Sequence, residues 1–191
     1  MSPRTKKQFK EIRKEKRAII MEAAIEVFAE KTFMGASVSM ITKKAGISKG
    51  LLYNYFDSKE DLLQQIIFEG IDEFIQVFDV NKDGVLTEDE FAYFIDETFR
   101  LLKKDIHFWK LYFSIIVQPD VMVLVQDKFM EILGPFLQTL MDYYEAKGIA
   151  NPMAHARLLG ALMDGVSMNY LVDPVSFPIE DIKKIIIDKF K

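Results

Sequence analysis

A twelve-residue segment, residues 79–90, presents oxygen-bearing groups at the spacing of a calcium loop. It reads DVNKDGVLTEDE, and the ligand positions are Asp79, Asn81, Asp83, Val85, Thr87 and Glu90. Ca²⁺ takes about six to eight oxygen ligands at roughly 2.3–2.6 Å, and a loop of this length wraps them around one point. Side-chain oxygens would come from the first three residues, a carbonyl from Val85, both carboxylate oxygens from Glu90, and a direct or water-mediated contact from Thr87. The pattern predicts a Ca²⁺ site, with a structural role preferred to a regulatory one.

The pattern is that of an EF-hand loop, in which Gly84 allows the sharp turn. Phe74 and Phe78 before the loop, and Phe91 and Phe94 after it, resemble the facing apolar sides of the two EF-hand helices. EF-hands usually pair, and the sequence has one such loop. An acidic surface connector is the alternative interpretation of the segment, and a switch of DNA affinity is the alternative role for an ion.

A second group of residues has the chemistry to contact DNA. Ser48 and Lys49 open a short segment that follows Gly46, and its outward positions combine Lys, Tyr, Asn and Leu. Such side chains suit hydrogen bonds to phosphates and contacts with thymine methyl groups. The predicted DNA-binding residues are Ser37, Lys49, Gly50, Leu51, Tyr53, Asn54, Tyr55 and Lys59.

The elements that position these residues are predicted to be helices almost throughout. Ser37 caps a short helix over 38–45, Gly46 takes the left-handed turn, and Ser48 caps a second helix over 49–55. A helix over about 11–31 precedes this pair, and one from Ser58 to about 78 follows it. The remaining helices are expected over about 87–104, 107–117, 119–146 with a kink at Gly134-Pro135, 152–171 capped by Asn151, and 178–190. The fold class is all-α, with about nine helices.

The segment SVSMITKKAGISKGLLYNYFDSKEDLL, residues 37–63, closely resembles the signature of the tetracycline-repressor (TetR) family. This resemblance implies a DNA-binding domain over 1–57 and a helical effector-binding and dimerisation domain over 58–191. It also implies that Lys49, Tyr53, Tyr55 and Lys59 contact phosphates, while Gly50, Leu51 and Asn54 approach base edges. Leu51 departs from the small or hydroxylated residue that the family often has, so the operator sequence is not predicted.

Charge is distributed unevenly along the chain. Residues 1–60 hold 13 Lys and Arg against 7 Asp and Glu, while the whole chain has a formal net charge of −4. A basic N-terminal part, here called the head (residues 1–60), followed by an acidic remainder suggests that the head binds a polyanion. Eight of the positive charges precede Ala18, namely Arg4, Lys6, Lys7, Lys10, Arg13, Lys14, Lys16 and Arg17. We expect this segment to be a solvated tail with non-specific attraction for phosphates, and a minor-groove arm is the alternative.

The second half of the chain is rich in aromatic residues and methionine. Most of these side chains are expected in the core, and in the TetR family this domain holds an apolar effector pocket. The residues predicted to line a pocket for an unknown small apolar effector are Trp109, Tyr112, Phe113 and Phe136.

The last two helices resemble the family's dimerisation pair. Small residues at Gly160, Ala161 and Gly165 leave room for close approach, and two apolar stripes accompany them. The stripes are Leu158, Leu162, Val166 and Tyr170 in one helix, and Ile182, Ile185, Ile186 and Phe190 in the next. Burial against a second copy would form a four-helix bundle, and the homodimer would present two heads to two half-sites.

The leading hypothesis is a sequence-specific DNA-binding regulator, expected to be a repressor, controlled by an effector in the second domain. A calcium sensor or buffer with a structural helix-turn-helix is the alternative. The chain has no cysteine, no nucleophile–base pair and no phosphate loop, so an enzyme is not expected. It also lacks a signal segment and a membrane-length apolar run, so a cytoplasmic protein that contacts no membrane is predicted.

Overall fold

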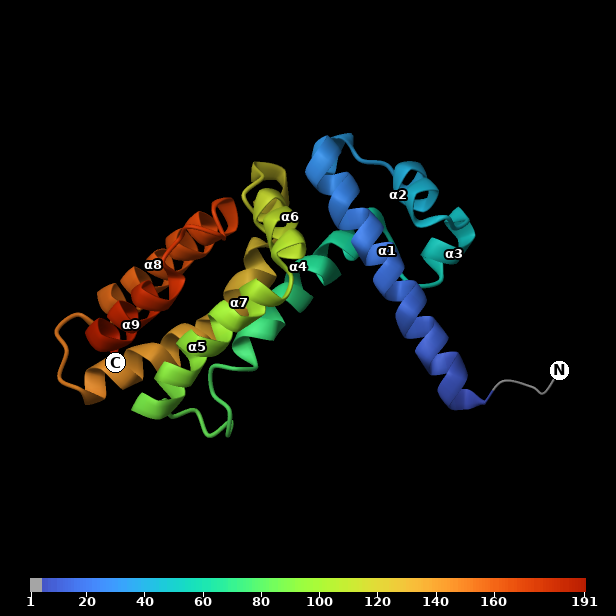
Figure 1. Cartoon of the computed structure of the whole chain (residues 1–191). Helices are drawn as coiled ribbons and strands as arrows, with labels where there is room; N and C mark the ends of the chain where they lie inside the picture. Colours follow the sequence, from blue (N-terminus) through green and yellow to red (C-terminus); the bar gives the residue numbers. More distant parts are fainter. Residues whose placement is uncertain (1–4) are drawn as a thin grey trace. The chain divides into compact units, whose positions relative to one another are not determined.

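The structure is a computed structural model that describes residues 5–191, apart from the side chain of Lys6. These residues form nine α-helices and no strand, which confirms the predicted all-α class (Figure 1). The helices are α1 (Lys6–Gly35), α2 (Val38–Ala45), α3 (Lys49–Tyr53), α4 (Lys59–Ile75), α5 (Glu88–Lys104), α6 (Ile106–Ile116), α7 (Pro119–Ala146), α8 (Pro152–Val172) and α9 (Ile179–Phe190).

Hydroxyl caps set the starts of the short helices near the N-terminus. The side chain of Ser37 accepts a hydrogen bond from the N–H of Met40 over 3.3 Å, and Ser48 accepts one from Leu51 over 3.2 Å. Ser58 likewise accepts from Asp61 over 3.0 Å at the start of α4. Each cap satisfies one backbone donor that the first turn of a helix leaves unpaired. The three caps predicted from the sequence are confirmed.

The first helix differs most from its prediction. It begins at Lys6 rather than near residue 11, because Thr5 and Gln8 form a reciprocal capping box at its start. The basic segment after Thr5 is therefore helical and not an irregular tail, while Arg4 lies outside the described residues. Near its other end, Thr32 interrupts the helix with φ 59° and ψ 164°. This break coincides with the loop predicted over residues 32–36.

One expectation in the later helices also needs correction. Asn151 precedes α8 as predicted, but it lies in the left-handed region, at φ 57°, and its side chain makes no cap hydrogen bond. Pro152 occupies the first turn instead, where its missing N–H costs nothing. The helix α7 runs from Pro119 to Ala146 with Pro135 inside it, and the kink predicted at Gly134-Pro135 remains a prediction.

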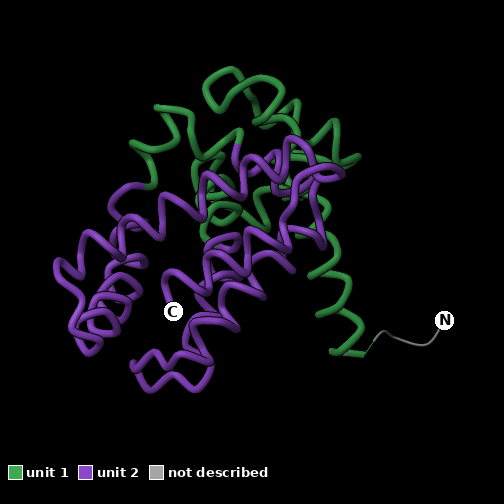
Figure 2. Tube along the Cα trace, turned by 60° about the vertical axis from the view of Figure 1, so that its left-hand side comes forward, with its two compact units in different colours: residues 1–68, 114–125 green, residues 69–113, 126–191 purple. Residues whose placement is uncertain are grey.

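The chain divides into two compact units (Figure 2). Unit 1 holds residues up to Phe68 together with Ser114–Val125, and unit 2 holds Glu69–Phe113 and Gln126–Lys191. The helices α4, α6 and α7 contribute residues to both units. The domain boundary predicted between residues 57 and 58 remains a prediction, since these units are defined by packing and not by independent folding.

The first four helices contribute aliphatic and aromatic side chains to the core of unit 1. Ile20, Ala24 and Phe28 of α1 are fully buried, and the faces of α2, α3 and α4 supply further buried side chains. These are Ile41, Leu52, Leu62, Leu63 and Ile66, and Phe56, between α3 and α4, is buried as well. The spacing of the α1 residues is the three-to-four-residue period of one helix face, which fixes the surface that α1 turns inward.

Unit 2 is organised around aromatic rings. Phe78 packs against Phe94 and Phe136, at centroid distances of 5.1 and 4.1 Å. The ring centroids of Trp109 and Phe74 lie 4.7 Å apart, and the indole N–H of Trp109 donates to the carbonyl of Leu101 over 3.0 Å. The pairing of the indole N–H allows this large polar-tipped ring to be buried.

Within residues 5–191, no single helix is both long and apolar enough to span a membrane. In the same range, one pair of helices, α6 and α7, meets the length and composition requirement when taken together, and the pair is bent by 96° at the break between them.

Candidate functional site

The turn between α2 and α3 holds the two helices in a fixed arrangement. Gly46 has φ 64°, and the N–H of Ile47 donates to the carbonyl of Thr42 over 3.0 Å. Ile41 of α2 and Leu52 of α3 are fully buried beneath the turn. A left-handed glycine followed by a capped short helix is the geometry of a helix-turn-helix, as the sequence predicted.

The outward face of α3 carries the predicted DNA contacts. Lys49, Gly50 and Asn54 are exposed, and Tyr53 is 51% exposed despite its size. Leu51 and Tyr55 are half-buried, with Tyr55 in the turn after the helix. The helix ends at Tyr53 rather than residue 55, so Asn54 and Tyr55 leave the helix axis at its C-terminal end. The surface thus offers one cation, two hydroxyl groups and one amide to a partner.

Ser37 and Lys59, the two predicted contacts outside α3, have partners within the unit. Ser37 uses its hydroxyl as the cap of α2. Lys59 donates from its ammonium to the carbonyls of Phe33 and Ala36 over 2.9 and 3.0 Å, and it lies 4.3 Å from the centre of the Phe33 ring. These carbonyls end α1, where a cation is favourable. Lys59 is therefore an anchor of the fold, and its predicted contact with phosphate remains a prediction.

Arg13 and Arg17 of α1 contact residues that follow α3, although the sequence pattern predicts them as part of a solvated tail. Arg13 donates to the carbonyl of Asn54 over 3.3 Å and lies 5.2 Å from the centre of the Tyr55 ring. Arg17 lies 5.4 Å from the Phe56 ring and donates to Gln65 over 2.5 Å. The four-residue spacing that places both arginines on one helix face was the signal available in the sequence.

The predicted calcium loop is folded around Asp79. Its carboxylate accepts the N–H groups of Lys82 and Gly84 over 2.7 and 2.8 Å. Asn81 accepts from the N–H of Asp83 over 3.0 Å, and Asp83 accepts from that of Val85 over 2.8 Å. The first half of the loop therefore uses its side-chain oxygens to order its own backbone.

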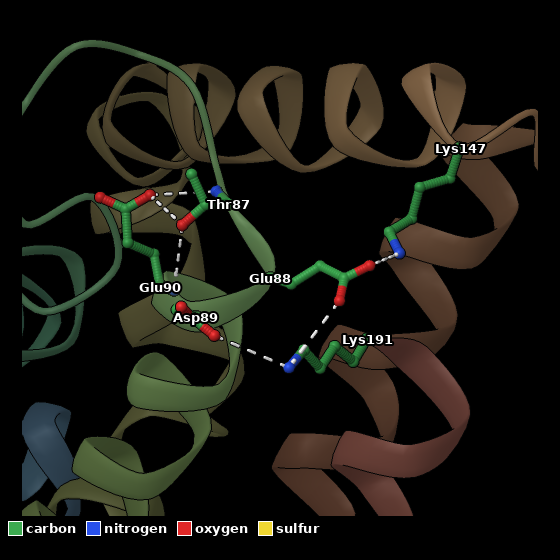
Figure 3. Close-up of polar contacts among 6 residues, drawn as sticks. All are labelled: Thr87, Glu88, Asp89, Glu90, Lys147 and Lys191. Atoms are coloured by element: carbon green, nitrogen blue, oxygen red, sulfur yellow. Dashed lines mark hydrogen bonds and ion pairs between the residues drawn. The ribbon is translucent and has the colours of Figure 1, made fainter.

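In the second half of the loop, the carboxylate of Glu90 is hydrogen-bonded to Thr87. Glu90 accepts hydrogen bonds from the N–H and the hydroxyl of Thr87, over 3.0 and 2.8 Å, and Thr87 in turn caps α5 (Figure 3). Across residues 5–191, no group of three or more His, Cys, Asp or Glu side chains is arranged to hold a metal ion. Glu90 thus takes part in the cap of α5, and Ca²⁺ binding by the loop remains a prediction.

Two lysines form ion pairs with Glu88, the residue that follows the cap residue Thr87. Glu88 lies 2.5 Å from the ammonium of Lys147, at the end of α7, and 3.8 Å from that of Lys191 (Figure 3). Asp89 also lies 3.8 Å from Lys191. The lysines lower the pKa of Glu88, mainly through the hydrogen bond from Lys147. The start of α5 is thus tied to the ends of α7 and α9.

The four residues predicted to line an effector pocket are packed in the aromatic interior of unit 2. Trp109 and Tyr112 are almost fully buried and lie 5.2 Å apart, edge to face. Phe113 lies 6.0 Å from Tyr112, whereas Phe136 packs with Phe78 and Phe94. Two hollows among the described residues lie elsewhere. One, of about 590 Å³, is lined by Met141, Glu145, Asn151–Ala154 and Arg157, and the other lies beside Arg100.

Three buried hydroxyl groups in unit 2, those of Thr98, Tyr143 and Tyr144, have no hydrogen-bond partner within the described residues. Thr98 is 5% exposed and Tyr144 2% exposed, and the oxygen of each is unpaired. Burial raises the pKa of the Tyr144 hydroxyl. An unpaired buried hydroxyl costs roughly 1–3 kcal/mol, so each marks a place where a partner atom would be favourable.

The helix α8 presents an apolar stripe to its surroundings. Leu158 is 56% exposed, Met168 46% and Val172 82%, and Ala161 and Gly165 lie between them at alternating intervals of three and four residues. Val166 and Tyr170, which were predicted for the same stripe, are buried inside unit 2. Ile185 of α9 is also exposed, whereas Ile186 is buried. The exposed apolar face of α8 is therefore rotated by about one residue from the predicted stripe, and its role in a dimer remains a prediction.

The helix-turn-helix with its exposed polar face defines the class of protein, a DNA-binding regulator. Comparison with known proteins supports this class. The family model for bacterial regulatory proteins of the tetR family matches residues 20–66. The chain is 36% identical over 87 residues to the fatty acid metabolism regulator protein of Bacillus subtilis, a match that covers 45% of each chain.

Two further relatives match over most of the chain. The chain is 28% identical over 161 residues to the HTH-type transcriptional regulator UidR of Escherichia coli, covering 82% of this chain and 80% of that one. The structure of FadR from Bacillus subtilis, in complex with stearoyl-CoA, superposes with a TM-score of 0.70 at 21% identity, over 90% of this chain and 95% of that one. Residues 20–66 thus match the tetR family of bacterial regulatory proteins, and over most of its length the chain is similar to a transcription regulator. Its relatives are regulators and not enzymes, as predicted.

Proposed function

We propose that the chain is a ligand-responsive repressor that binds a duplex operator as a homodimer. The observation that carries the proposal is the exposed face of α3, where Lys49, Tyr53 and Asn54 are held outward by a buried core. Side chains of these types bind phosphates and base edges, and the capped, packed helix orders them before binding. A cytoplasmic location and the absence of membrane contact remain predictions that fit this role.

The experiment is selection of duplexes from a random pool, followed by affinity measurements on the enriched sequence. We expect an inverted repeat, since two copies present two α3 helices to two half-sites. Tyr53→Ala and Asn54→Ala should each lower affinity by about tenfold, the effect of losing roughly 1.4 kcal/mol. Tyr93→Ala is the matched control, because Tyr93 is similarly exposed, at 44%, on α5. An absence of enrichment, or equal loss in the control, would overturn the proposal.

The homodimer is supported by the stripe on α8 and by Ile185 on α9. Exposed apolar side chains separated by Gly and Ala permit two helices to approach closely and bury their seam. The same arrangement on a second copy would form a four-helix bundle. Two heads joined in this way can reach two half-sites on one duplex.

The effector is proposed to be an apolar molecule that carries polar groups. The interior of unit 2 is rich in aromatic rings, and the hydroxyls of Thr98 and Tyr144 lack partners among the described residues. An apolar ligand would be stabilised by packing against the rings, and its polar atoms by hydrogen bonds to the hydroxyls. The FadR relative was solved with stearoyl-CoA, so a long-chain acyl thioester is the first compound to test.

The effector test uses stearoyl-CoA, with stearate and free coenzyme A as separate probes. We expect stearoyl-CoA to raise the melting temperature and to release the selected duplex. Tyr144→Phe and Thr98→Val should each keep or raise the stability of the unliganded protein, because each removes an unpaired hydroxyl. Both should weaken the ligand's effect. Release that is identical in wild type and in both variants would exclude these hydroxyls from the site, and no response to any probe would exclude this ligand class.

Calcium binding remains a proposal that rests on the loop pattern and on the network around Asp79. No step of regulation is assigned to the ion. Titration of Ca²⁺ into metal-free protein by calorimetry tests it, with Glu90→Gln as the variant and Asp89→Asn as the exposed control. One site per chain, lost only in Glu90→Gln, would support a calcium loop. No heat up to millimolar Ca²⁺ would identify the segment as an acidic connector. The alternative of a calcium sensor or buffer has no support from the relatives, which are DNA-binding regulators.

A further inference from the structure

The N-terminal turns of α1 carry a basic stripe that is aligned with the recognition helix. At about 100° per residue, Lys7, Lys10, Arg13, Lys14 and Arg17 fall within an arc of about 120° on the helix surface. Glu15 falls outside this arc, and Glu11 lies just beyond its edge, about 40° from Lys7. Charges that are separated in this way give one face of a helix a positive potential.

The C-terminal part of this stripe touches the DNA-binding head. Arg13 donates to the carbonyl of Asn54, and Arg17 lies against Phe56, directly after α3. Lys10 lies about 4.5 Å and Lys7 about 9 Å farther along the helix axis from Arg13, at a rise of about 1.5 Å per residue. The basic stripe therefore begins next to the C-terminal end of α3 and continues along α1 toward its N-terminus.

The lysines of the stripe have no competing carboxylate among the described residues. Lys7, Lys10 and Lys14 are exposed, and within residues 5–191 none of them lies within ion-pair distance of an acidic side chain. The first turns of α1 also run past α2 and α3 without another element of unit 1 beside them (Figure 1). Phe9, 58% exposed, shows that these turns are not covered by the core. Their positive charge is thus available to a partner.

We propose that this stripe binds the phosphate backbone of duplex DNA next to the half-site that α3 occupies. Each strand presents a phosphate about every 3.4 Å of helix axis, so an extension of about 9 Å spans two or three of them. Charge complementarity and continuity with the α3 surface select DNA over the acidic second unit of another copy. The helix extends the contact as an ordered face, and it contributes affinity and not sequence preference. This inference rests on the proposed DNA binding.

The test compares the triple variant Lys7→Gln, Lys10→Gln, Lys14→Gln with the wild type on the selected duplex and on an unrelated duplex. Glutamine preserves helix propensity, so circular dichroism should be unchanged. The slope of log affinity against log salt should fall by about 0.9 for each phosphate that a protomer no longer neutralises. Affinity at physiological salt should fall at least tenfold on both duplexes. Backbone protection should shorten by two or three phosphates at each outer edge.

Two controls separate a local contact from general charge. The triple variant Lys104→Gln, Lys110→Gln, Lys189→Gln changes the net charge equally in unit 2 and should leave the slope unchanged. Within α1, Lys10→Gln should lower the slope, whereas Lys16→Gln, which lies off the stripe, should not. If wild type and the α1 triple variant have equal slopes and equal protection, the stripe does not contact DNA although the head does. If the wild type binds neither duplex, the proposed function fails as well. If the α1 variant alters only self-association, the partner is a second copy of the chain.

Discussion

The side chain of Gln118 accepts a hydrogen bond from the backbone N–H of Phe33 over 2.9 Å, across 85 positions of sequence. Its amide group donates to the carbonyls of Phe28 and Ser114, over 3.4 and 3.2 Å. Gln118 lies in the turn between α6 and α7, and Phe33 directly follows the break in α1 at Thr32. One side chain therefore joins that turn to the end of the first helix.

Replacing Gln118 with alanine should destabilise the protein by about 1–3 kcal/mol, because the N–H of Phe33 loses its partner in a part-buried place. In a chain of this size this corresponds to a fall in melting temperature of a few degrees, roughly 2–4 °C for each kcal/mol. Gln138→Ala is the control, since the side chain of Gln138 donates to Asp142 in an exposed place. Equal melting temperatures for the two variants would show that the Gln118 hydrogen bonds contribute nothing.

Lys59 and Lys49 should respond differently to the same substitution. Lys59→Gln should lower the free energy of unfolding by about 3 kcal/mol, because hydrogen bonds to charged groups contribute roughly 1.5–3 kcal/mol each and the variant removes two of them. Lys49→Gln should leave stability unchanged and weaken DNA binding, since Lys49 is exposed on α3. Denaturant titration and DNA titration of both variants decide this. A stable Lys59→Gln protein with weak DNA binding would reverse the assignment.

The glycines of the helix-turn-helix should also separate fold from binding. A Cβ at Gly50 would meet no atom within 4 Å, so Gly50→Ala should raise stability by up to about 1 kcal/mol. It should still lower operator affinity by about tenfold if the backbone approaches DNA there. Gly46→Ala should lower stability by roughly 1 kcal/mol or more, because φ is 64° at this position. Unchanged affinity in Gly50→Ala would place Gly50 away from the DNA.

The stripe on α8 can be tested with charge. Leu158→Glu combined with Met168→Glu should convert the dimer to a monomer, because carboxylates in an apolar seam lose hydration without gaining partners. Sedimentation at several concentrations measures the change. Val117→Glu is the control, because Val117 is 61% exposed and does not belong to the stripe. A double variant that remains dimeric would place the interface on another surface.

Local signals predicted most of the helix starts. Ser37, Ser48 and Ser58 each accept a hydrogen bond from a backbone N–H three residues later, so their capping roles can be predicted from short segments. The predicted start of α1 lies too late because apolar periodicity begins only at Ile19, whereas the capping box of Thr5 and Gln8 carries no apolar signal. A helix start that is set by polar residues, with no apolar periodicity beside it, is therefore predicted less accurately from the sequence.

Roles that depend on distant partners could not be read in this way. Lys59 resembles a phosphate contact in sequence, and only the position of the α1 carbonyls shows that it anchors the fold. Trp109 and Phe136 have the composition expected of both a pocket and a core, and the ring distances show packing. Glu90 fits a ligand position and a helix cap equally well, and the structure uses the cap.

The break in α1 has a practical consequence for protein engineering. Thr32 has φ 59° and ψ 164°, a region that is nearly restricted to glycine and costs other residues roughly 1–3 kcal/mol. Its hydroxyl accepts a long hydrogen bond, of 3.4 Å, from the N–H of Gly35, so little is lost with the side chain. Thr32→Gly should therefore raise the melting temperature by a few degrees, measured by calorimetry, whereas Thr32→Val should lower it. Thr32→Gly is thus one substitution toward a more heat-resistant regulator for crystallisation or biosensor use, at a position outside the predicted DNA contacts.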